Sequence, residues 1–159
     1  MNKYFCYVFF LILSLGFYFD DLKINYSDLS TDLFNSIPIA IKFDNPQLFE
    51  NDLFLDEINS LLYYCPLFIK IIQFGNFITG DYLTGIKIIH FIINILYSFG
   101  WFFLFKQCTN NNFASFIFTL LSRGVLWPPG KEIWGIMGVW TFLPRTIFLA
   151  IIPFLLLIV

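Results

Sequence analysis

The residues best suited to chemistry are acids that gather in one segment of the chain. From residue 42 to 57 the sequence is KFDNPQLFENDLFLDE, with carboxylates at Asp44, Glu50, Asp52, Asp56 and Glu57. Carboxylate oxygens are hard ligands, so Asp44, Glu50 and Asp52 are candidates for holding Mg²⁺ or Mn²⁺ against a phosphate. Alternatively, Asp44 or Asp52 acts as a general base on an acceptor hydroxyl. A solvated loop without chemistry explains the same acids.

Two arginines lie in otherwise apolar stretches, Arg123 near the end of one and Arg145 directly after Pro144. The guanidinium fork matches a phosphate, so both side chains are candidates for binding a lipid phosphate. The alternative is that each arginine lies along apolar surface and extends its charged end to the headgroups.

A third set of polar residues recurs along an apolar segment. Lys87, His90, Asn94 and Ser98 follow one another at helical spacing and share one face. Polar groups in hydrocarbon are costly and usually face other helices or water. The segment is therefore expected in a bundle. Because His90 has no second ligand nearby in sequence, a hydrogen-bonded core histidine is favoured over a metal ligand or proton relay.

The segment that carries this face predicts a membrane-spanning helix over residues 83–106. Its central run, 88–105, contains no Asp, Glu, Lys or Arg. Eighteen residues rise about 27 Å as a helix, close to the hydrocarbon thickness of about 30 Å. Twelve of these residues are Leu, Ile or Phe, which favour insertion.

Composition and charge point to the same class of protein. The chain is 58% hydrophobic and 13% charged, against about 25% charged in a typical soluble domain. Residues 20–60 contain nine acids and two lysines, a net of −7, and the remainder nets +5. A segment so poor in Lys and Arg crosses a membrane readily, whereas Lys3 and Lys106 favour the cytoplasm. The net charge of −2 and the absence of a basic patch argue against nucleic-acid binding.

The elements therefore predict an all-α membrane protein forming one transmembrane domain over residues 1–159. About four transmembrane helices are expected, together with one or two interfacial helices in the outer loop. The predicted segments are a first span at 4–19, an outer loop at 20–82, a second span at 83–106, a short third span at 113–127 and a last span at 143–159.

Three of these segments need comment. The first span is interpreted as an uncleaved signal anchor rather than a cleaved signal peptide, because no small-x-small cleavage site follows it. Within the outer loop, residues 61–78 alternate apolar positions with Lys70, Gln73 and Asn76, which is typical of a helix in the headgroup layer. The chain stops inside IIPFLLLIV, so a longer polytopic protein is expected. This topology places the chain in the cell membrane with its amino terminus inside.

The order of these parts resembles the amino-terminal part of C-type (GT-C) polytopic glycosyltransferases. The resemblance rests on a first span, an acidic outer loop, YCPLFIKII at 64–72, Thr79-Gly80-Asp81 and a long span ending in Lys106. The segments NPQLFEND at 45–52 and LPRT at 143–146 also look like uncharacterised bacterial multi-span proteins. The resemblance implies a polyprenyl-phosphate-linked sugar as donor and a catalytic acid in the first outer loop, at Asp44 or Asp52.

A different class of function stays open beside the enzyme. The alternative is a non-enzymatic membrane subunit whose polar face, Lys87, His90, Asn94 and Ser98, docks another membrane subunit. A transporter would need paired broken helices in two halves, and no second half is present in the sequence. Walker, Rossmann, zinc-peptidase and nucleophile-elbow motifs are missing.

Overall fold

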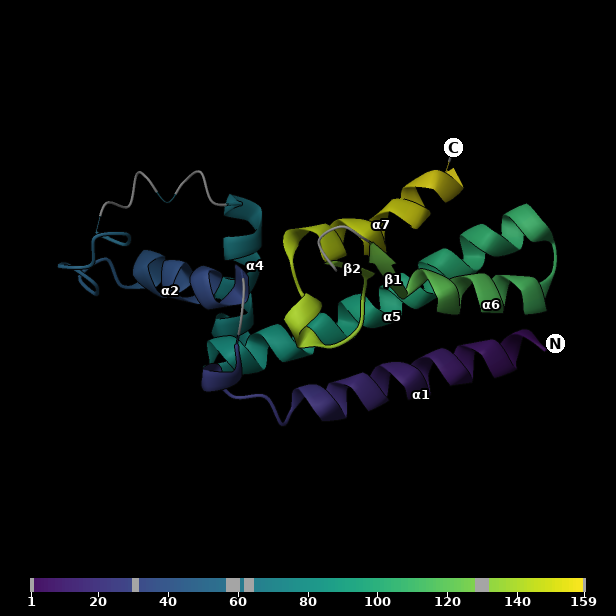
Figure 1. The fold of residues 1–159 in the computed structure, drawn as a ribbon, viewed down its shortest axis with the longest axis horizontal. Coiled ribbons are helices and arrows are strands. Elements are labelled where there is room, and N and C mark those ends of the chain that lie inside the picture. The colour runs from purple at the N-terminus through teal and green to yellow at the C-terminus, as the bar shows by residue number, and fades with distance from the viewer. Residues whose placement is uncertain (1, 30–31, 57–60, 62–64, 128–131, 159) are drawn as a thin grey trace. The chain divides into compact units, whose positions relative to one another are not determined.

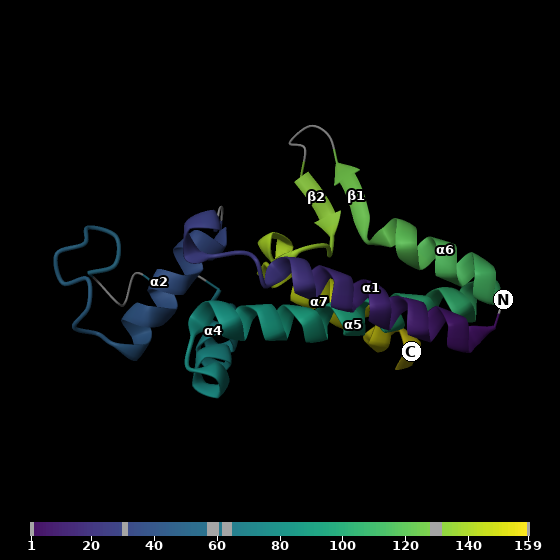
Figure 2. The same ribbon diagram turned by 90° about the horizontal axis from the view of Figure 1, so that it is seen from below.

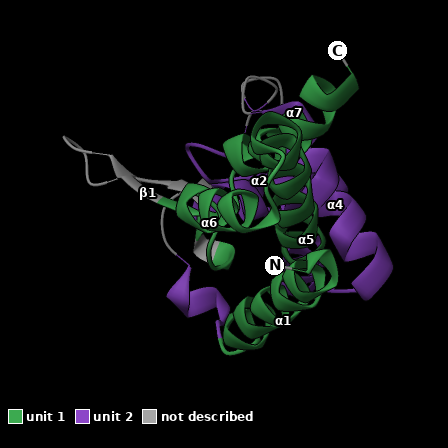
Figure 3. Ribbon diagram, turned by 90° about the vertical axis from the view of Figure 1, so that its right-hand side faces the viewer, with its two compact units in different colours: residues 1–23, 90–159 green, residues 24–89 purple. Residues whose placement is uncertain are grey.

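A computed structural model describes residues 2–29, 32–56, 61, 65–127 and 132–158 of the chain. The chain divides into two compact units, which are described separately (Figure 3). Unit 1 comprises Met1–Lys23 and His90–Val159, and unit 2 comprises Ile24–Ile89. One long helix, α5 (Tyr82–Thr109), contributes its first residues to unit 2 and the rest to unit 1.

Unit 1 is built mainly from helices. Its other elements are α1 (Lys3–Asp21), α6 (Asn112–Ser122), β1 (Gly124–Trp127), β2 (Glu132–Gly135), a 3₁₀ turn η2 (Val139–Thr141) and α7 (Pro144–Ile158). Asn2 caps α1 by accepting from the Tyr4 N–H, and Asn111 caps α6 in the same way. An asparagine in this position satisfies amides that have no partner inside the helix.

Phenylalanine packing holds these helices together. Cys6 and Phe10 of α1 form a buried cluster with Phe102 of α5 and Phe116 of α6. The three helices run side by side in both ribbon views (Figures 1 and 2). Rings meet at centroid separations of 5.0 Å for Phe9 with Phe116 and 5.7 Å for Phe10 with Phe102. Such aromatic pairs add to the free energy of area burial, which accounts for part of the high phenylalanine content.

A short hairpin interrupts the helices. β1 pairs antiparallel with β2, with Gly124 opposite Gly135 and Leu126 opposite Ile133. Residues 128–131, between the two strands in sequence, lie outside the described part of the chain. The segment predicted as a short third span at 113–127 is therefore helical only as far as Ser122 and continues as a strand.

Unit 2 contains a 3₁₀ turn η1 (Tyr26–Asp28), α2 (Asp32–Asp44) and α4 (Pro66–Thr79), together with the first residues of α5. Pro66 begins α4, and Gly80 ends it with a φ of 77°. A positive φ strains residues that carry a Cβ, so glycine suits this stop. The chain then turns into α5, where Asp81 accepts from the Thr84 N–H at 2.8 Å.

The prediction of a helical protein is confirmed, with the hairpin as an addition. Within the described ranges, two helices, α1 and α5, are long and apolar enough to cross a membrane. Only 22% of the apolar window of α1 and 39% of that of α5 is buried. The remaining positions are partly or fully exposed, and lipid solvates apolar side chains better than water does, which gives weak support for a membrane location. At 11 and 15 residues, α6 and α7 are shorter than a typical transmembrane helix.

Candidate functional site

The most completely buried polar pair of unit 1 joins Asp21 and His90. Asp21 is the last residue of α1, and its Oδ2 lies 2.7 Å from His90 Nδ1. Its Oδ1 accepts from the Val139 N–H, also at 2.7 Å. The side chains are 1% and 0% exposed. The pair therefore ties the end of α1 to α5 and to the turn before α7, as expected for a hydrogen-bonded core histidine. His90 Nε2 is buried and has no partner among the described residues.

The α5 residues that follow His90 on the same face contact Arg123, which directly follows α6. The Arg123 side chain is buried. Its guanidinium donates to the Asn94 side-chain oxygen and to Ser98 Oγ, and it lies 5.1 Å from the Phe17 ring centroid. Asn94 in turn donates to the carbonyl of Met137 at 3.1 Å. Asn94 and Ser98 thus provide acceptors for Arg123 inside unit 1, and contact of this guanidinium with lipid headgroups stays a prediction.

The polar face of α5 is covered by the chain itself. Lys87 donates to the carbonyl of Ile24 at 2.6 Å, within unit 2, and His90, Asn94 and Ser98 have the partners given above. All four side chains are buried. Apart from His90 Nε2, the polar groups of this face have partners within the described part of the chain. Docking of another membrane subunit on this face stays a prediction.

Among the acids of unit 2, Asp44 has the most defined surroundings. It ends α2 and is exposed, and its Oδ2 accepts from the Tyr82 hydroxyl at 2.6 Å. Its Oδ1 accepts from the Gln73 side-chain amide. A carboxylate held by donors from α4 and α5 has a fixed position and remains accessible. These are properties of a general base, and that role stays a prediction.

The other acids do not join Asp44. Oδ1 of Asp52 accepts from the amides of Phe54 and Leu55, both at 2.9 Å, so part of its capacity is used to close its own loop. Glu50 and Asp56 are exposed, and Glu57 lies outside the described residues. Within the described ranges, no three His, Cys, Asp or Glu residues gather in a way that would hold a metal ion. The predicted set of Asp44, Glu50 and Asp52 is therefore not brought together as a metal site.

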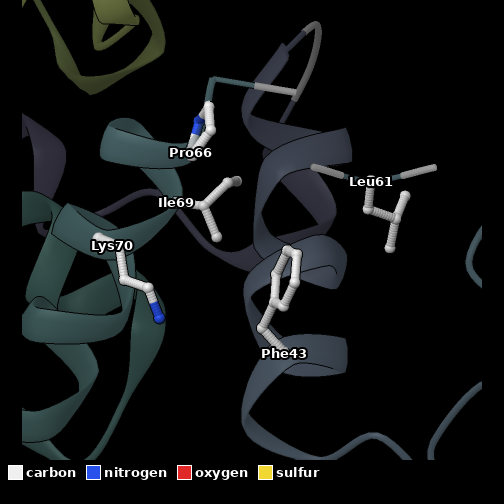
Figure 4. A pocket seen from close by; sticks show the side chains of 5 residues that line it. All are labelled: Phe43, Leu61, Pro66, Ile69 and Lys70. Atoms are coloured by element: carbon white, nitrogen blue, oxygen red, sulfur yellow. The ribbon is translucent and has the colours of Figure 1, made fainter. Parts of the chain in front are cut away.

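A small pocket lies between α2 and α4, on the two helices that also carry Asp44 and its partner Gln73. It measures about 160 Å³ and is lined by Phe43, Leu61, Pro66, Ile69 and Lys70. Figure 4 shows Phe43 and Ile69 with their side chains between the helices, and the Lys70 side chain extends toward the same space. Among the described lining residues the walls are apolar, and Lys70 supplies a positive charge.

A second anchored carboxylate, Asp81, begins α5. The Tyr26 hydroxyl donates to its Oδ1 at 2.6 Å and accepts from the Leu83 N–H at 3.2 Å. Burial raises the pKa of Asp81, but hydrogen bonds from Tyr26 and Thr84 outweigh burial and hold that pKa below its ordinary value. Burial, and then donation to Asp81, raise the pKa of Tyr26 to about 12.

These two shifts predict a contact that is lost at both ends of the pH scale. The pKa of Asp81 is lowered on folding, so its contribution is present above its unfolded value of 3.8 and is lost as the pH falls through the folded value. The pKa of Tyr26 is raised, so its contribution is lost as the pH rises from 10 to about 12. We expect the Leu83 amide to lose protection from hydrogen exchange, corrected for intrinsic rate, in both ranges. Tyr26→Phe should abolish both transitions; their persistence in that variant would contradict this assignment.

Sequence reasoning missed several residues of these sites. Asp21 was counted among the loop acids, and its place two residues after the end of the first apolar run does not separate it from its neighbour Asp20. Tyr82 and Gln73 gave no signal, because their partner Asp44 lies 38 and 29 residues away. Arg145, the second residue of α7, is partly buried, and a lipid-phosphate role for either arginine stays a prediction.

Comparison of the chain with protein-family models, curated proteins and solved structures finds no match. The fold and the sites define its class only as a helical protein with two candidate membrane-spanning helices, a buried Asp–His pair in unit 1 and an anchored, accessible carboxylate in unit 2.

Proposed function

We propose that the chain is a multi-pass membrane protein that binds a lipid-linked phosphate on the outer membrane surface. Support for the membrane location comes from the length and apolar character of α1 and α5 and from exposed apolar side chains of α1 such as Phe5 and Ile12. Support for an outer position of residues 24–82 comes from their acidic character, because segments poor in Lys and Arg are translocated readily. In this proposal α1 and α5 cross the bilayer, and the shorter α6 and α7 complete the bundle.

One observation carries the binding proposal: the apolar pocket and the anchored Asp44 carboxylate are built on the same two helices, α2 and α4. Phe43 and Ile69 provide apolar walls for the part of a lipid next to its phosphate. Lys70 provides a compact positive charge, which suits a phosphate oxygen. The pocket is too small for a long chain, so the remainder of the lipid would stay in the bilayer.

The resemblance to GT-C glycosyltransferases suggests the reaction. In that reaction an acceptor hydroxyl attacks the anomeric carbon of a sugar, the bond to the polyprenyl phosphate breaks, and the lipid phosphate leaves. Asp44 would take the hydroxyl proton as general base, held in place by Tyr82 and Gln73. Lys70 would pair with the leaving phosphate. No step of this scheme uses Arg123, whose guanidinium is engaged inside unit 1.

Binding can be tested before catalysis. Undecaprenyl phosphate is added to the purified protein in detergent, and binding is measured by native mass spectrometry. We expect the lipid to bind the unmodified chain. Lys70→Ala should weaken binding about tenfold, because a charge-assisted contact contributes roughly 1.5–3 kcal/mol. Lys23→Ala is the matched control, since Lys23 is an exposed lysine outside the pocket. Equal losses in the two variants would mean that general surface charge, not the pocket, attracts the lipid.

Catalysis is tested separately by Asp44→Asn, which keeps the shape of the side chain and can still accept from Tyr82. Loss of a general base is expected to slow sugar transfer about 100-fold or more while lipid binding is retained. Asp56→Asn changes an exposed acid of the same segment and should leave transfer intact. If Asp44→Asn transfers sugar at the unmodified rate, Asp44 is not the base.

A further inference from the structure

A second cavity lies on another part of α2 and differs in chemistry from the pocket beside Lys70. It measures about 400 Å³. The residues of its lining that matter here are Phe34, Asn35, Pro38, Phe49, Asp52 and Phe54. Three aromatic rings and one carboxylate thus line a single space, and no basic side chain is among the described residues of the lining. Its size falls within the range of small-molecule sites.

The carboxylate in this wall has capacity left for a ligand. Oδ1 of Asp52 accepts from the amides of Phe54 and Leu55, which fixes the position of the side chain. Oδ2 makes no hydrogen bond with a described residue, and Lys42, the base on α2, donates instead to the carbonyl of Leu48 at 2.8 Å. Asp52 is therefore a negative charge without a positive partner among the described side chains.

The three aromatic rings of this cavity are exposed to solvent rather than buried in the core of unit 2. Phe34 is 61% exposed, Phe54 is 59% exposed and Phe49 is 37% exposed. Phe49 also has a φ of 64°, a left-handed conformation that bulky residues rarely adopt. Strained residues of this kind are concentrated at binding and active sites.

Charge decides which ligand suits this wall. The segment 20–60 has a net charge of −7, so an anion would be repelled. An uncharged apolar chain would leave Asp52 without a countercharge. An organic cation suits both the aromatic rings and the Asp52 carboxylate, because aromatic faces attract positive charge and a carboxylate pairs with it. Quaternary ammonium groups fit best, since their methyl groups pack on the rings while the charge stays accessible to Asp52.

We propose that the cavity bounded by Phe34, Phe49, Phe54 and Asp52 binds a quaternary ammonium group, as in a choline headgroup. The rings surround the methyl groups, Asp52 balances the charge, and Asn35 supplies a polar contact for the rest of the ligand. This site is independent of the proposed lipid-phosphate pocket, which uses Phe43 and Lys70.

The experiment compares choline with dimethylbutanol, its neutral isostere in which carbon replaces the ammonium nitrogen. Binding to the intact protein is followed by NMR chemical-shift titration in a detergent that lacks choline headgroups. We expect choline to bind at least about fivefold more tightly than the isostere, which matches one charge–carboxylate contact. Asp52→Asn preserves the amide contacts of the side chain and should remove most of this preference.

Two further variants test the rings. Phe34→Leu and Phe54→Leu keep apolar volume but remove the aromatic face, so each should weaken choline binding about two- to fivefold. Phe77→Leu and Glu50→Gln are the matched controls, because both side chains are exposed in unit 2 and neither lines the cavity. Equal binding of choline and the isostere, no binding of choline, or equal losses in the controls would each overturn the proposal. Lys70→Ala should not change choline binding, which separates this result from the lipid-phosphate test.

Discussion

Asp21→Ala is expected to lower the free energy of unfolding by about 2–6 kcal/mol, because two buried groups each lose their hydrogen-bond partner at a cost of about 1–3 kcal/mol each. The change leaves His90 Nδ1 without the acceptor that now lies 2.7 Å away. It also leaves the Val139 N–H, buried in the turn before α7, without its partner. Both losses occur where side chains have almost no contact with solvent. Reversible unfolding in mixed micelles measures the effect.

Asp20 provides a matched control for this prediction. It is the neighbouring acid, its side chain is 73% exposed, and it pairs with Lys23 on the surface. Asp20→Ala should change the free energy of unfolding by no more than about 1 kcal/mol. The double variant Asp21→Ala/His90→Leu should recover part of the loss, because no unpaired imidazole remains. Equal effects of the two single aspartate changes would show that the buried pair does not hold unit 1 together.

Gly85→Ala should produce the second large effect. Gly75 of α4 and Gly85 of α5 bring two helix backbones into contact inside unit 2. A Cβ on Gly85 would lie 2.3 Å from the carbonyl carbon of Gly75, where backbone, not a flexible side chain, obstructs it. The two helices must move apart, and overpacking of this kind costs about 1–3 kcal/mol. Unfolding of the intact protein by denaturant is the measurement.

Gly16→Ala is the control that tests whether replacing any helical glycine, rather than the close contact at Gly85, causes the loss of stability. Gly16 lies within α1, and nothing lies within 4 Å of a Cβ placed there. Alanine should therefore stabilise α1 by about 0.5–1 kcal/mol, through helix propensity alone. Opposite signs at Gly16 and Gly85 support the close contact. A stabilising Gly85→Ala would mean that α4 and α5 are further apart than the structure shows.

The long helices were predictable because their signal is local. The segments predicted at 4–19 and 83–106 correspond to α1 at 3–21 and α5 at 82–109. The extra residues at their ends are mostly polar, such as Asp20 and Asp21, which hydropathy assigns to a loop. The helix predicted within 61–78 corresponds to α4, which begins at Pro66 and ends before Gly80, two residues whose effect on a helix is equally local. The number of spans and the side on which residues 20–82 lie stay predictions.

The hairpin and the polar contacts were not predictable, because they depend on partners distant in sequence. A short apolar run such as Gly124–Trp127 suits a helix or a strand equally, and pairing with β2 decides between them. Arg123 lies inward because Asn94 and Ser98, about 25 residues earlier, offer acceptors. Likewise, Asp44 was a candidate from its residue type alone, whereas its anchoring by Tyr82 is visible only in three dimensions.

The bond between Asp21 and Val139 also has a consequence for biosynthesis. The two residues are 118 positions apart, and His90 lies 69 positions after Asp21. At a synthesis rate of 5–20 residues per second, the ribosome needs roughly 6–24 s to reach Val139 after making Asp21. During that time α1 carries a carboxylate whose partners do not yet exist, and a carboxylate is poorly tolerated in hydrocarbon. In the proposed membrane topology, the first helix would therefore wait near the membrane surface or in the insertion machinery until the second half of the chain arrives.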